Sequence, residues 1–269
     1  MTDHPILVAG AGGRMGRAVT VEILKTPGLA LAGGFERSDS PVIGVDMGLL
    51  VGAEPLGVKV ADTIEPALSR AAALIDFTTP AASLENARAA SAAGVAHILG
   101  TTGFSSEEEA EIARLAKKTA IVKSGNMSLG VNLLAALVEQ AARCLPDDYD
   151  IEILDIHHRD KVDAPSGTAL MLGRAAADGR GVDLDARMVR GRDGVTGPRQ
   201  AGDIGFAVIR GGGVVGEHSV LFAGSEEVLT FSHKALDRAL FAKGAVTAAK
   251  WAADKPPGLY SMRDVLGVS

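Results

Sequence analysis

The chain has 269 residues, 47% hydrophobic and 22% charged, which is an ordinary composition for a soluble globular protein. A formal net charge of −6 disfavours non-specific nucleic-acid binding, because that function requires a clustered basic face. The single cysteine, Cys144, excludes an intrachain disulfide, and no Cys/His set has structural-zinc spacing, so a reducing, cytoplasmic location is the simplest expectation. No apolar run approaches the roughly 18 residues of a bilayer span, and the first residues lack the basic region of a signal peptide. We therefore expect neither a nucleic-acid nor a membrane partner.

Short apolar runs alternate with helix-like stretches over the first half of the chain. Strands are predicted at residues 5–10, 29–35, 73–77, 95–100 and 120–123, and helices from a glycine-rich turn to about residue 25, at 80–93 and at 106–118. Ser106 and Glu109 have the spacing of a capping box at the start of the last helix. Strands that alternate with helices predict a parallel sheet covered on both faces.

The pattern changes after about residue 127. Helices are predicted at 130–143, 166–177 and 235–253, and strand-like runs at 149–156, 186–190, 204–210, 214–222 and 227–233. These elements predict an α+β layer with a mixed or mostly antiparallel sheet. We expect a dinucleotide-binding domain formed by residues 1–127 with 240–269, and a substrate-binding and oligomerisation domain formed by residues 128–239. The tail at 259–266 is expected to pack back on the first domain, and 191–203 to form a long mobile loop.

A glycine-rich turn lies between the first predicted strand and the first helix, with the sequence Gly10-Ala11-Gly12-Gly13-Arg14-Met15-Gly16. Gly10 suits a tight turn, Gly12 a close approach to a pyrophosphate, and Gly16 close packing of helix on strand. An anion would lie at the helix N-terminus, where unpaired N–H groups and the helix dipole favour it. The usual third glycine falls one residue earlier, at Met15, so the turn is a variant. A glycine turn that binds nothing is the alternative.

Glu36 stands at the end of the second predicted strand and Arg37 follows it. An acid there accepts hydrogen bonds from the adenine ribose and favours NAD, whereas an adjacent arginine can pair with the 2′-phosphate of NADP. The pair predicts that both NADH and NADPH are used, with a solvated strand end as the alternative. Three later strand ends, at 77–80, 100–103 and 124–127, carry small polar residues and glycine that suit the ligand crevice of a parallel sheet.

The most distinctive segment runs from residue 157 to residue 169. Two histidines, an arginine and a lysine lie within five residues, and the segment ends in Ala-Pro-Ser-Gly-Thr at a predicted helix start. Ser166 suits an N-cap, and the N–H groups that follow it offer a second anion site. Cations opposite a helix N-terminus suit a small substrate with carboxylates, and a histidine suits general acid catalysis near neutral pH. A solvated charged loop is the alternative for the charged cluster alone.

The glycine turn and the segment His157–Ala169 together resemble the 4-hydroxy-tetrahydrodipicolinate reductases (dihydrodipicolinate reductases) of lysine biosynthesis. The resemblance covers essentially the whole chain, including residues 100–104, 216–218 and 262–266. It implies a Rossmann-type nucleotide domain with a parallel sheet, an α+β domain with a mixed sheet, and a homotetramer. It also implies NADH- or NADPH-dependent reduction of a dianionic cyclic imine, with loss of water, to tetrahydrodipicolinate.

The resemblance also implies roles for individual residues. His157 matches the general acid and Lys161 the second proton donor. His158, Gly167 and Thr168 match the contacts to the substrate carboxylates. The cofactor contacts fall on four segments, formed by Gly10, Ala11, Gly12, Gly13, Arg14 and Met15, by Glu36 and Arg37, by Gly100, Thr101 and Thr102, and by Ser124, Gly125, Asn126 and Met127. No metal is expected.

Two other functions stay open from the residues alone. One is an NAD(P)-dependent aspartate or homoserine dehydrogenase of similar layout, and the other is a nucleotide-sensing protein without turnover. His157 and Lys161 favour the reductase, because a sensor needs no proton donor. Cys144 has no neighbouring histidine or glycine turn, which argues against an aspartate-semialdehyde dehydrogenase. The reductase interpretation requires residues 157–168 to face the nucleotide crevice, so that one dianionic ring can touch both.

Overall fold

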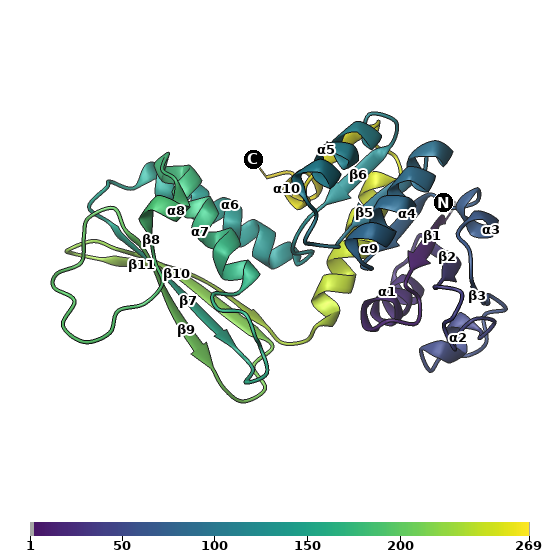
Figure 1. Ribbon diagram of the computed structural model, residues 1–269, viewed down its shortest axis with the longest axis horizontal. Helices are drawn as coiled ribbons and strands as arrows, with labels where there is room; N and C mark the ends of the chain where they lie inside the picture. Colours follow the sequence, from purple (N-terminus) through teal and green to yellow (C-terminus); the bar gives the residue numbers. More distant parts are fainter. Residues whose placement is uncertain (1–2, 269) are drawn as a thin grey trace. The chain divides into compact units, whose positions relative to one another are not determined.

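A computed structural model describes residues 3–268 (Figure 1). The chain divides into two compact units. The first unit contains residues 3–129 and 239–267, and the second contains residues 130–238 with residue 268. Among the described residues, no helix is both long enough and apolar enough to cross a membrane.

The first unit is built on a seven-stranded sheet in the order β12-β6-β5-β4-β1-β2-β3, in which every pair is parallel. Its strands are β1 His4–Ala9, β2 Leu29–Phe35, β3 Val60–Ala61, β4 Ala73–Asp76, β5 Ala96–Leu99, β6 Ala120–Lys123 and β12 Gly258–Tyr260. Its helices are α1 Arg14–Lys25, α2 Met47–Leu50, α3 Glu65–Leu68, α4 Pro80–Ala93, α5 Ser106–Leu115, α9 Ala239–Ala252 and α10 Met262–Leu266. Because β2 and β4 flank β1 on opposite sides, the strand order reverses at β1, and ligands of such sheets bind at this point.

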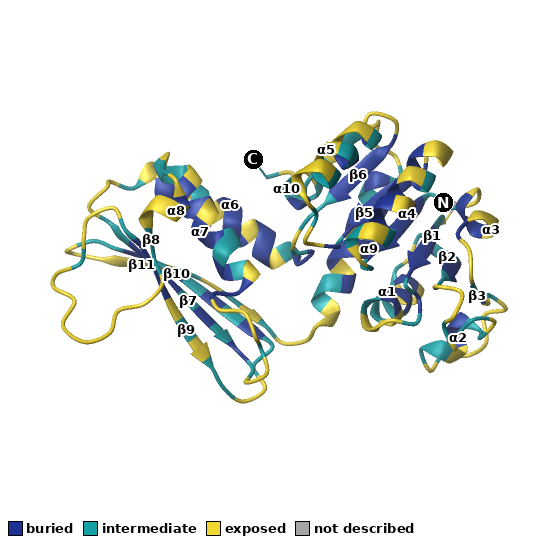
Figure 2. Cartoon of the chain, viewed as in Figure 1, coloured by how far each residue is buried: buried dark blue, intermediate teal, exposed yellow. Residues whose placement is uncertain are grey.

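Both faces of this sheet are covered, which explains its continuous apolar strands. All residues of β4 and β5 are buried, and Figure 2 colours both strands dark blue. Ile6 and Val8 pack in a cluster with α1 and α9, whereas Leu7 lies in a cluster with α3 and α4 on the opposite face. The predicted Rossmann-type parallel sheet is therefore confirmed.

The second unit carries a mixed five-stranded sheet in the order β11-β10-β7-β9-β8. Its elements are α6 Leu129–Cys144, β7 Asp150–His157, α7 Gly167–Arg180, α8 Leu184–Arg187, β8 Met188–Val189, β9 Ile204–Arg210, β10 Gly216–Ala223 and β11 Val228–Ala235. Strand β7 is parallel to β9 and antiparallel to β10. Ile151, Ile153 and Phe222 pack with the helices on one face, so buried and half-buried residues alternate along β7. The predicted α+β unit with a mixed sheet is confirmed.

The capping box of α5 lies one residue earlier than predicted. Ser105, not Ser106, is the N-cap, and its hydroxyl accepts a hydrogen bond of 3.2 Å from the N–H of Glu108. The Glu108 carboxylate accepts in return from the N–H of Ser105 at 2.7 Å. Because residues 107–109 are all glutamates, the pairs Ser105–Glu108 and Ser106–Glu109 both have the spacing of a capping box. The backbone geometry selects the first pair.

Two further boundaries differ from the sequence prediction. The helix predicted at 235–253 begins at Ala239, because β11 continues to Ala235 in antiparallel pairing with β10. The strand predicted at 186–190 is reduced to the two residues of β8, because α8 extends to Arg187. Strand pairing sets the first of these boundaries and the extent of α8 sets the second, so in both places a neighbouring element, rather than local propensity, decides.

Three other segments are more ordered than the sequence indicates. Residues 37–72 contain α2, β3 and α3, none of which was predicted. The tail packs on the first unit as expected, but it does so by adding β12 to the sheet beside β6. The loop 191–203 is anchored to β7, because the guanidinium groups of Arg192 and Arg199 both donate to the Glu152 carboxylate.

Candidate active site

The glycine-rich turn adopts the geometry that a dinucleotide fingerprint requires. Gly10 has a φ of +63°, a conformation that favours glycine. A Cβ at Gly16 would lie 2.1 Å from the carbonyl oxygen of Gly10, so only glycine lets α1 pack this closely on the turn. Gly13 is the N-cap residue of α1. The N–H of Gly12 donates to Glu36 Oε1 at 3.0 Å, which ties the turn to the end of β2.

A cavity of about 680 Å³ opens at the carboxyl ends of β1, β2 and β4. Its walls are formed by Gly10, Gly13, Phe35, Glu36, Arg37, Asp62, Thr63, Ile64, Glu65, Phe77, Thr78, Thr79, Ala82, Glu85 and Asn86. Four predicted cofactor residues, from the glycine turn and from Glu36-Arg37, therefore line one space. The wall formed by residues 62–65 was missed, because the two-residue strand before it is too short to recognise in the sequence.

The other predicted cofactor residues lie at the same edge of the same sheet. Arg14 and Met15 are in the first turn of α1, Gly100–Thr102 follow β5, and Ser124–Met127 follow β6. These strands are parallel neighbours, so their carboxyl ends form one edge. The side chains of Ala11 and Met127 are buried in the core, so a cofactor could contact these two residues only through their backbone.

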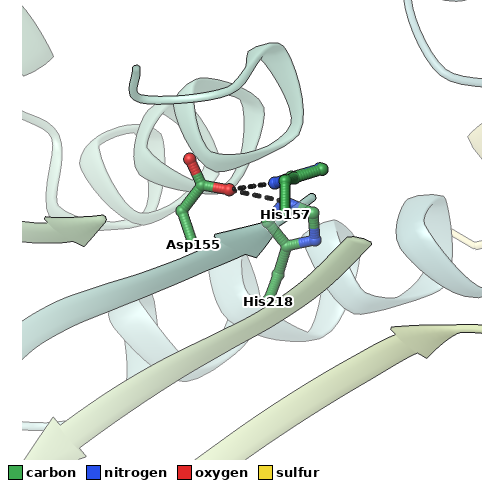
Figure 3. A group of neighbouring side chains, drawn as sticks. All are labelled: Asp155, His157 and His218. Carbon is green, nitrogen blue, oxygen red and sulfur yellow. Dashed lines mark ion pairs between the residues drawn. The ribbon is translucent and has the colours of Figure 1, made fainter. Parts of the chain in front are cut away.

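The second unit brings a carboxylate and two histidines together (Figure 3). Asp155 and His157 are two residues apart on β7, so their side chains share a face, and His157 Nδ1 lies 2.7 Å from Asp155 Oδ1. His218 is opposite Asp155 on β10, and its Nε2 lies 3.4 Å from the same oxygen. The two imidazoles meet edge to face, with ring centroids 5.0 Å apart.

Asp155 also joins this group to the start of α7. Its Oδ2 accepts from the backbone N–H of Ser166 at 2.7 Å and from the guanidinium of Arg210 at 3.1 Å. Ser166 in turn caps α7 by accepting from the N–H of Ala169. Burial would raise the pKa of Asp155, but the contact with His218 and the hydrogen bonds from Ser166 and Arg210 outweigh it and hold that pKa well below its ordinary value. Asp155 is therefore a carboxylate at neutral pH.

His157 is buried, and burial lowers its pKa below the ordinary value of 6.5. The negative charge of Asp155 opposes this shift, whereas the charges of His218 and Lys161 reinforce it. In the unliganded protein the imidazole is therefore mainly neutral at pH 7. A dianionic ligand beside it would raise its pKa and favour the protonated, acid form.

The other site residues predicted in this unit are Lys161, as the second proton donor, and the substrate residues His158, Gly167 and Thr168. His158 Nε2 lies 3.2 Å from the guanidinium of Arg238. Lys161 Nζ donates to Asp163 Oδ1 at 2.7 Å. Gly167 and Thr168 are the first two residues of α7, directly after its Ser166 cap.

The residues that hold this group in place differ in how far the sequence marks them. Asp155 carried one signal, because an acid on the apolar face of a strand predicts a buried and paired carboxylate. His218 lies in the segment 216–218 that shares the family resemblance and was expected to be a structural hydrogen-bonding histidine, but its partner Ser166 is 52 residues away. Arg210 and Arg238 carried no signal, because their partners lie 55 and 80 residues away.

Asp155, His157 and His218 could each offer one ligand atom to a metal ion, with these atoms within 4.8 Å of one another. Two observations favour a hydrogen-bonded group instead. Arg210 already pairs with the carboxylate, and the positive charge of Lys161 acts on His157, so a divalent cation would be repelled. The three side chains are therefore better suited to proton transfer than to metal coordination.

Comparison with known proteins gives the same result for both units. Residues 4–127 match the N-terminal part, and residues 130–266 the C-terminal part, of the family described as dihydrodipicolinate reductase. A 4-hydroxy-tetrahydrodipicolinate reductase of Rhodopseudomonas palustris (strain BisB18) is 54% identical over 269 residues, covering 100% of this chain and 99% of the relative. The 4-hydroxy-tetrahydrodipicolinate reductase 1 of Mesorhizobium japonicum (strain LMG 29417 / CECT 9101 / MAFF 303099) is 57% identical over 268 residues, covering 99% and 98%.

A solved structure supports the fold. The dipicolinate-bound dihydrodipicolinate reductase from Paenisporosarcina sp. TG-14 is similar with a TM-score of 0.79 at 21% identity, covering 97% of this chain and 98% of that one. Both halves of the chain, in sequence and in fold, have counterparts in the same enzymes. The chain belongs to the dihydrodipicolinate reductase family.

Proposed function

We propose that the chain is an NAD(P)H-dependent 4-hydroxy-tetrahydrodipicolinate reductase, which reduces this cyclic imine diacid, with loss of water, in the diaminopimelate route to lysine. The observation in this chain that carries the proposal is the buried carboxylate of Asp155. It contacts the imidazole of His157 and also holds the N-terminus of α7. One fixed group thereby places a proton donor beside an anion site, which is the arrangement that reduction of a carboxylated ring requires.

The first unit is suited to hold the cofactor. Gly16 lets the first turn of α1 pack closely on the glycine turn, next to the N-terminus of the helix. Glu36 lines the cavity, where its carboxylate can accept hydrogen bonds from ribose hydroxyls. Arg37 follows in the same wall and can pair with a 2′-phosphate, so we infer that both cofactor forms are used. When bound, NADH or NADPH supplies the hydride.

The second unit is suited to bind the substrate and to deliver the proton. The start of α7 at Gly167-Thr168 and the side chain of His158 receive the ring carboxylates, which fixes the orientation of the ring. The bound dianion raises the pKa of His157. Because Asp155 lies at Nδ1, Nε2 is the atom that His157 presents to the substrate. The hydroxyl leaves as water together with the hydrogen of the neighbouring ring carbon. The hydride then adds to the ring, and His157 donates the one proton that balances it to the position that gains electron density, with Lys161 as the second donor for that proton.

We further propose a homotetramer in the cytoplasm. The face of the five-stranded sheet opposite the helices carries half-buried Leu154 and Leu221, and Ile209 and Val228 are 49% and 58% exposed there. An open apolar sheet face of this kind suits packing against a second copy of the chain. Light scattering of the wild type and of Ile209→Glu tests this, because a monomeric wild type would contradict it. The free thiol of Cys144 is compatible with a reducing compartment.

The activity is tested by following NAD(P)H absorbance with freshly generated cyclic imine substrate. We expect turnover that depends on this substrate, with no oxidation of aspartate or homoserine in the reverse direction. His157→Ala and Lys161→Ala should each lower kcat by about 10²-fold or more, as loss of a general acid does, with the Kd for NADH within about twofold of the wild type. Turnover of aspartate or homoserine, or variants that lose only NADH binding, would contradict the proposal.

A further inference from the structure

The first unit contains a second buried carboxylate, which the proposed mechanism does not use. Asp76 is the last residue of β4 and is fully buried. Its Oδ1 accepts from the N–H and the hydroxyl of Thr78, at 2.8 and 2.7 Å, and from the hydroxyl of Ser83 at 3.0 Å. Its Oδ2 accepts from the Asn86 amide at 2.8 Å and lies 3.4 Å from Nε2 of the buried His97.

This carboxylate is strongly held in its charged form although no lysine or arginine pairs with it among residues 3–268. Burial alone would raise the pKa of Asp76, but the contact with His97 and the hydrogen bonds from Asn86 and Thr78 lower it to about 2. Burying a charge costs free energy unless hydrogen bonds satisfy it. The donors around Asp76 are therefore held in fixed positions by its carboxylate.

Those groups are the strand ends that form the cofactor edge. Thr78 and Asn86 line the 680 Å³ cavity, and Thr78 Cγ2 lies 3.0 Å from the place of a Cβ at Gly10, in the glycine turn. Ser83 extends the network, because its hydroxyl lies 2.7 Å from the hydroxyl of Thr101. Asp76 thereby connects, through one or two hydrogen bonds, the loop after β4, the start of α4 and the loop after β5.

We propose that Asp76 is a positioning residue for the dinucleotide. It orders the loops after β4 and β5 before the cofactor binds, through Thr78 directly and through Ser83 to Thr101. A site whose loops are already ordered loses less conformational entropy on binding, so the affinity for the cofactor is higher. This inference rests on the proposed function only in taking the bound dinucleotide to be NADH or NADPH.

The test uses NADH as the probe and needs no substrate. The Kd for NADH is measured by the fluorescence of the bound nicotinamide, on full-length protein whose fold is checked by circular dichroism and whose Tm is recorded. Asp76→Ala should raise the Kd by about tenfold or more. Asp76→Asn should raise it by about threefold or less, because its remaining oxygen can still accept from Thr78, whose backbone N–H is an obligate donor.

Ser83→Ala keeps the inference testable if Asp76→Ala does not fold. It breaks the link to Thr101 and should raise the Kd by about fivefold. Ser91→Ala is the matched control, because Ser91 is also buried on α4 but donates to the carbonyl of Leu115, away from the network, and should leave the Kd within twofold. If the network around Asp76 had only a structural role, both serine variants would have a lower Tm, and their Kd values for NADH would be equal.

Equal Kd values for Ser83→Ala and Ser91→Ala, or an unchanged Kd in folded Asp76→Ala, would overturn the inference. Its failure remains distinguishable from a failure of the proposed function. A wild type that binds NADH but does not reduce the cyclic imine would refute the reductase assignment and leave the NADH comparison intact.

Discussion

The Asp155→Asn substitution gives the sharpest test of the second unit, because the structure determines how the new amide must orient. One carboxylate oxygen of Asp155 accepts from two obligate donors, the backbone N–H of Ser166 and the guanidinium of Arg210. The other faces His157, which can exchange its donor and acceptor nitrogens. In the variant the amide oxygen therefore stays with Ser166 and Arg210, and the amide NH₂ turns toward His157.

This orientation reverses the role of His157 Nδ1. The nitrogen must now accept, so the imidazolium form loses its ion pair with the carboxylate, in which Nδ1 lies 2.7 Å from Asp155 Oδ1. A contact between two charged groups at this distance contributes about 1.5–3 kcal/mol, which converts to a loss of about 10- to 150-fold in kcat for an enzyme that uses the imidazolium as its acid. The Kd for NADH should not change, because Asp155 belongs to the second unit and the cofactor residues to the first.

The assay is steady-state reduction of the substrate, together with NMR of ¹⁵N-labelled histidine to identify the protonated ring nitrogen. Asp147→Asn is the matched control, because Asp147 pairs with Arg180 in the same unit but has a side chain that is 98% exposed. Surface ion pairs of this kind contribute little, so the control should retain wild-type kcat. A kcat for Asp155→Asn within threefold of the wild type, or a neutral wild-type His157 protonated at Nε2, would refute the reasoning.

Two other predictions concern the glycine turn and the pH dependence. Gly16→Ala should lower the free energy of unfolding by about 1–3 kcal/mol, because the added Cβ would overlap the carbonyl oxygen of Gly10, whereas Gly191→Ala, which meets open space, should have little effect. Thermal unfolding measures both, and equal Tm values would contradict the prediction. Because burial lowers the pKa of His157 and the acid form is the active one, kcat/KM should fall as pH rises through a pKa below 6.5, and kcat, measured with the dianion bound, should fall at a higher pH. A pH–rate profile that puts the kcat/KM limb at or above pH 7 would show that His157 is not the acid.

Much of the fold follows from local sequence alone. Apolar runs such as residues 73–77 and 95–100 predict strands buried on both faces, and the helices between them require a parallel sheet. The glycine turn at residues 10–16 is also recognisable, because the positive φ of Gly10 and the close approach at Gly16 admit few other residues. The chemistry-bearing segment 157–169 is equally local, since the strand end, the loop and the N-cap follow one another along the chain.

Contacts between residues distant in sequence are set by the folded chain and cannot be read from local pattern. Asp155 meets residues 166, 210 and 218, and Asp76 meets His97 and, through Ser83, Thr101. Neither group can therefore be recognised as a whole in a short window of sequence. The pKa directions of Asp155 and His157 depend on these same contacts and on burial. Local sequence patterns indicate which residues are candidates for catalysis or binding, because the spacing of these residues is local. The charge state and the orientation of each side chain depend on neighbours that come together only in the folded chain.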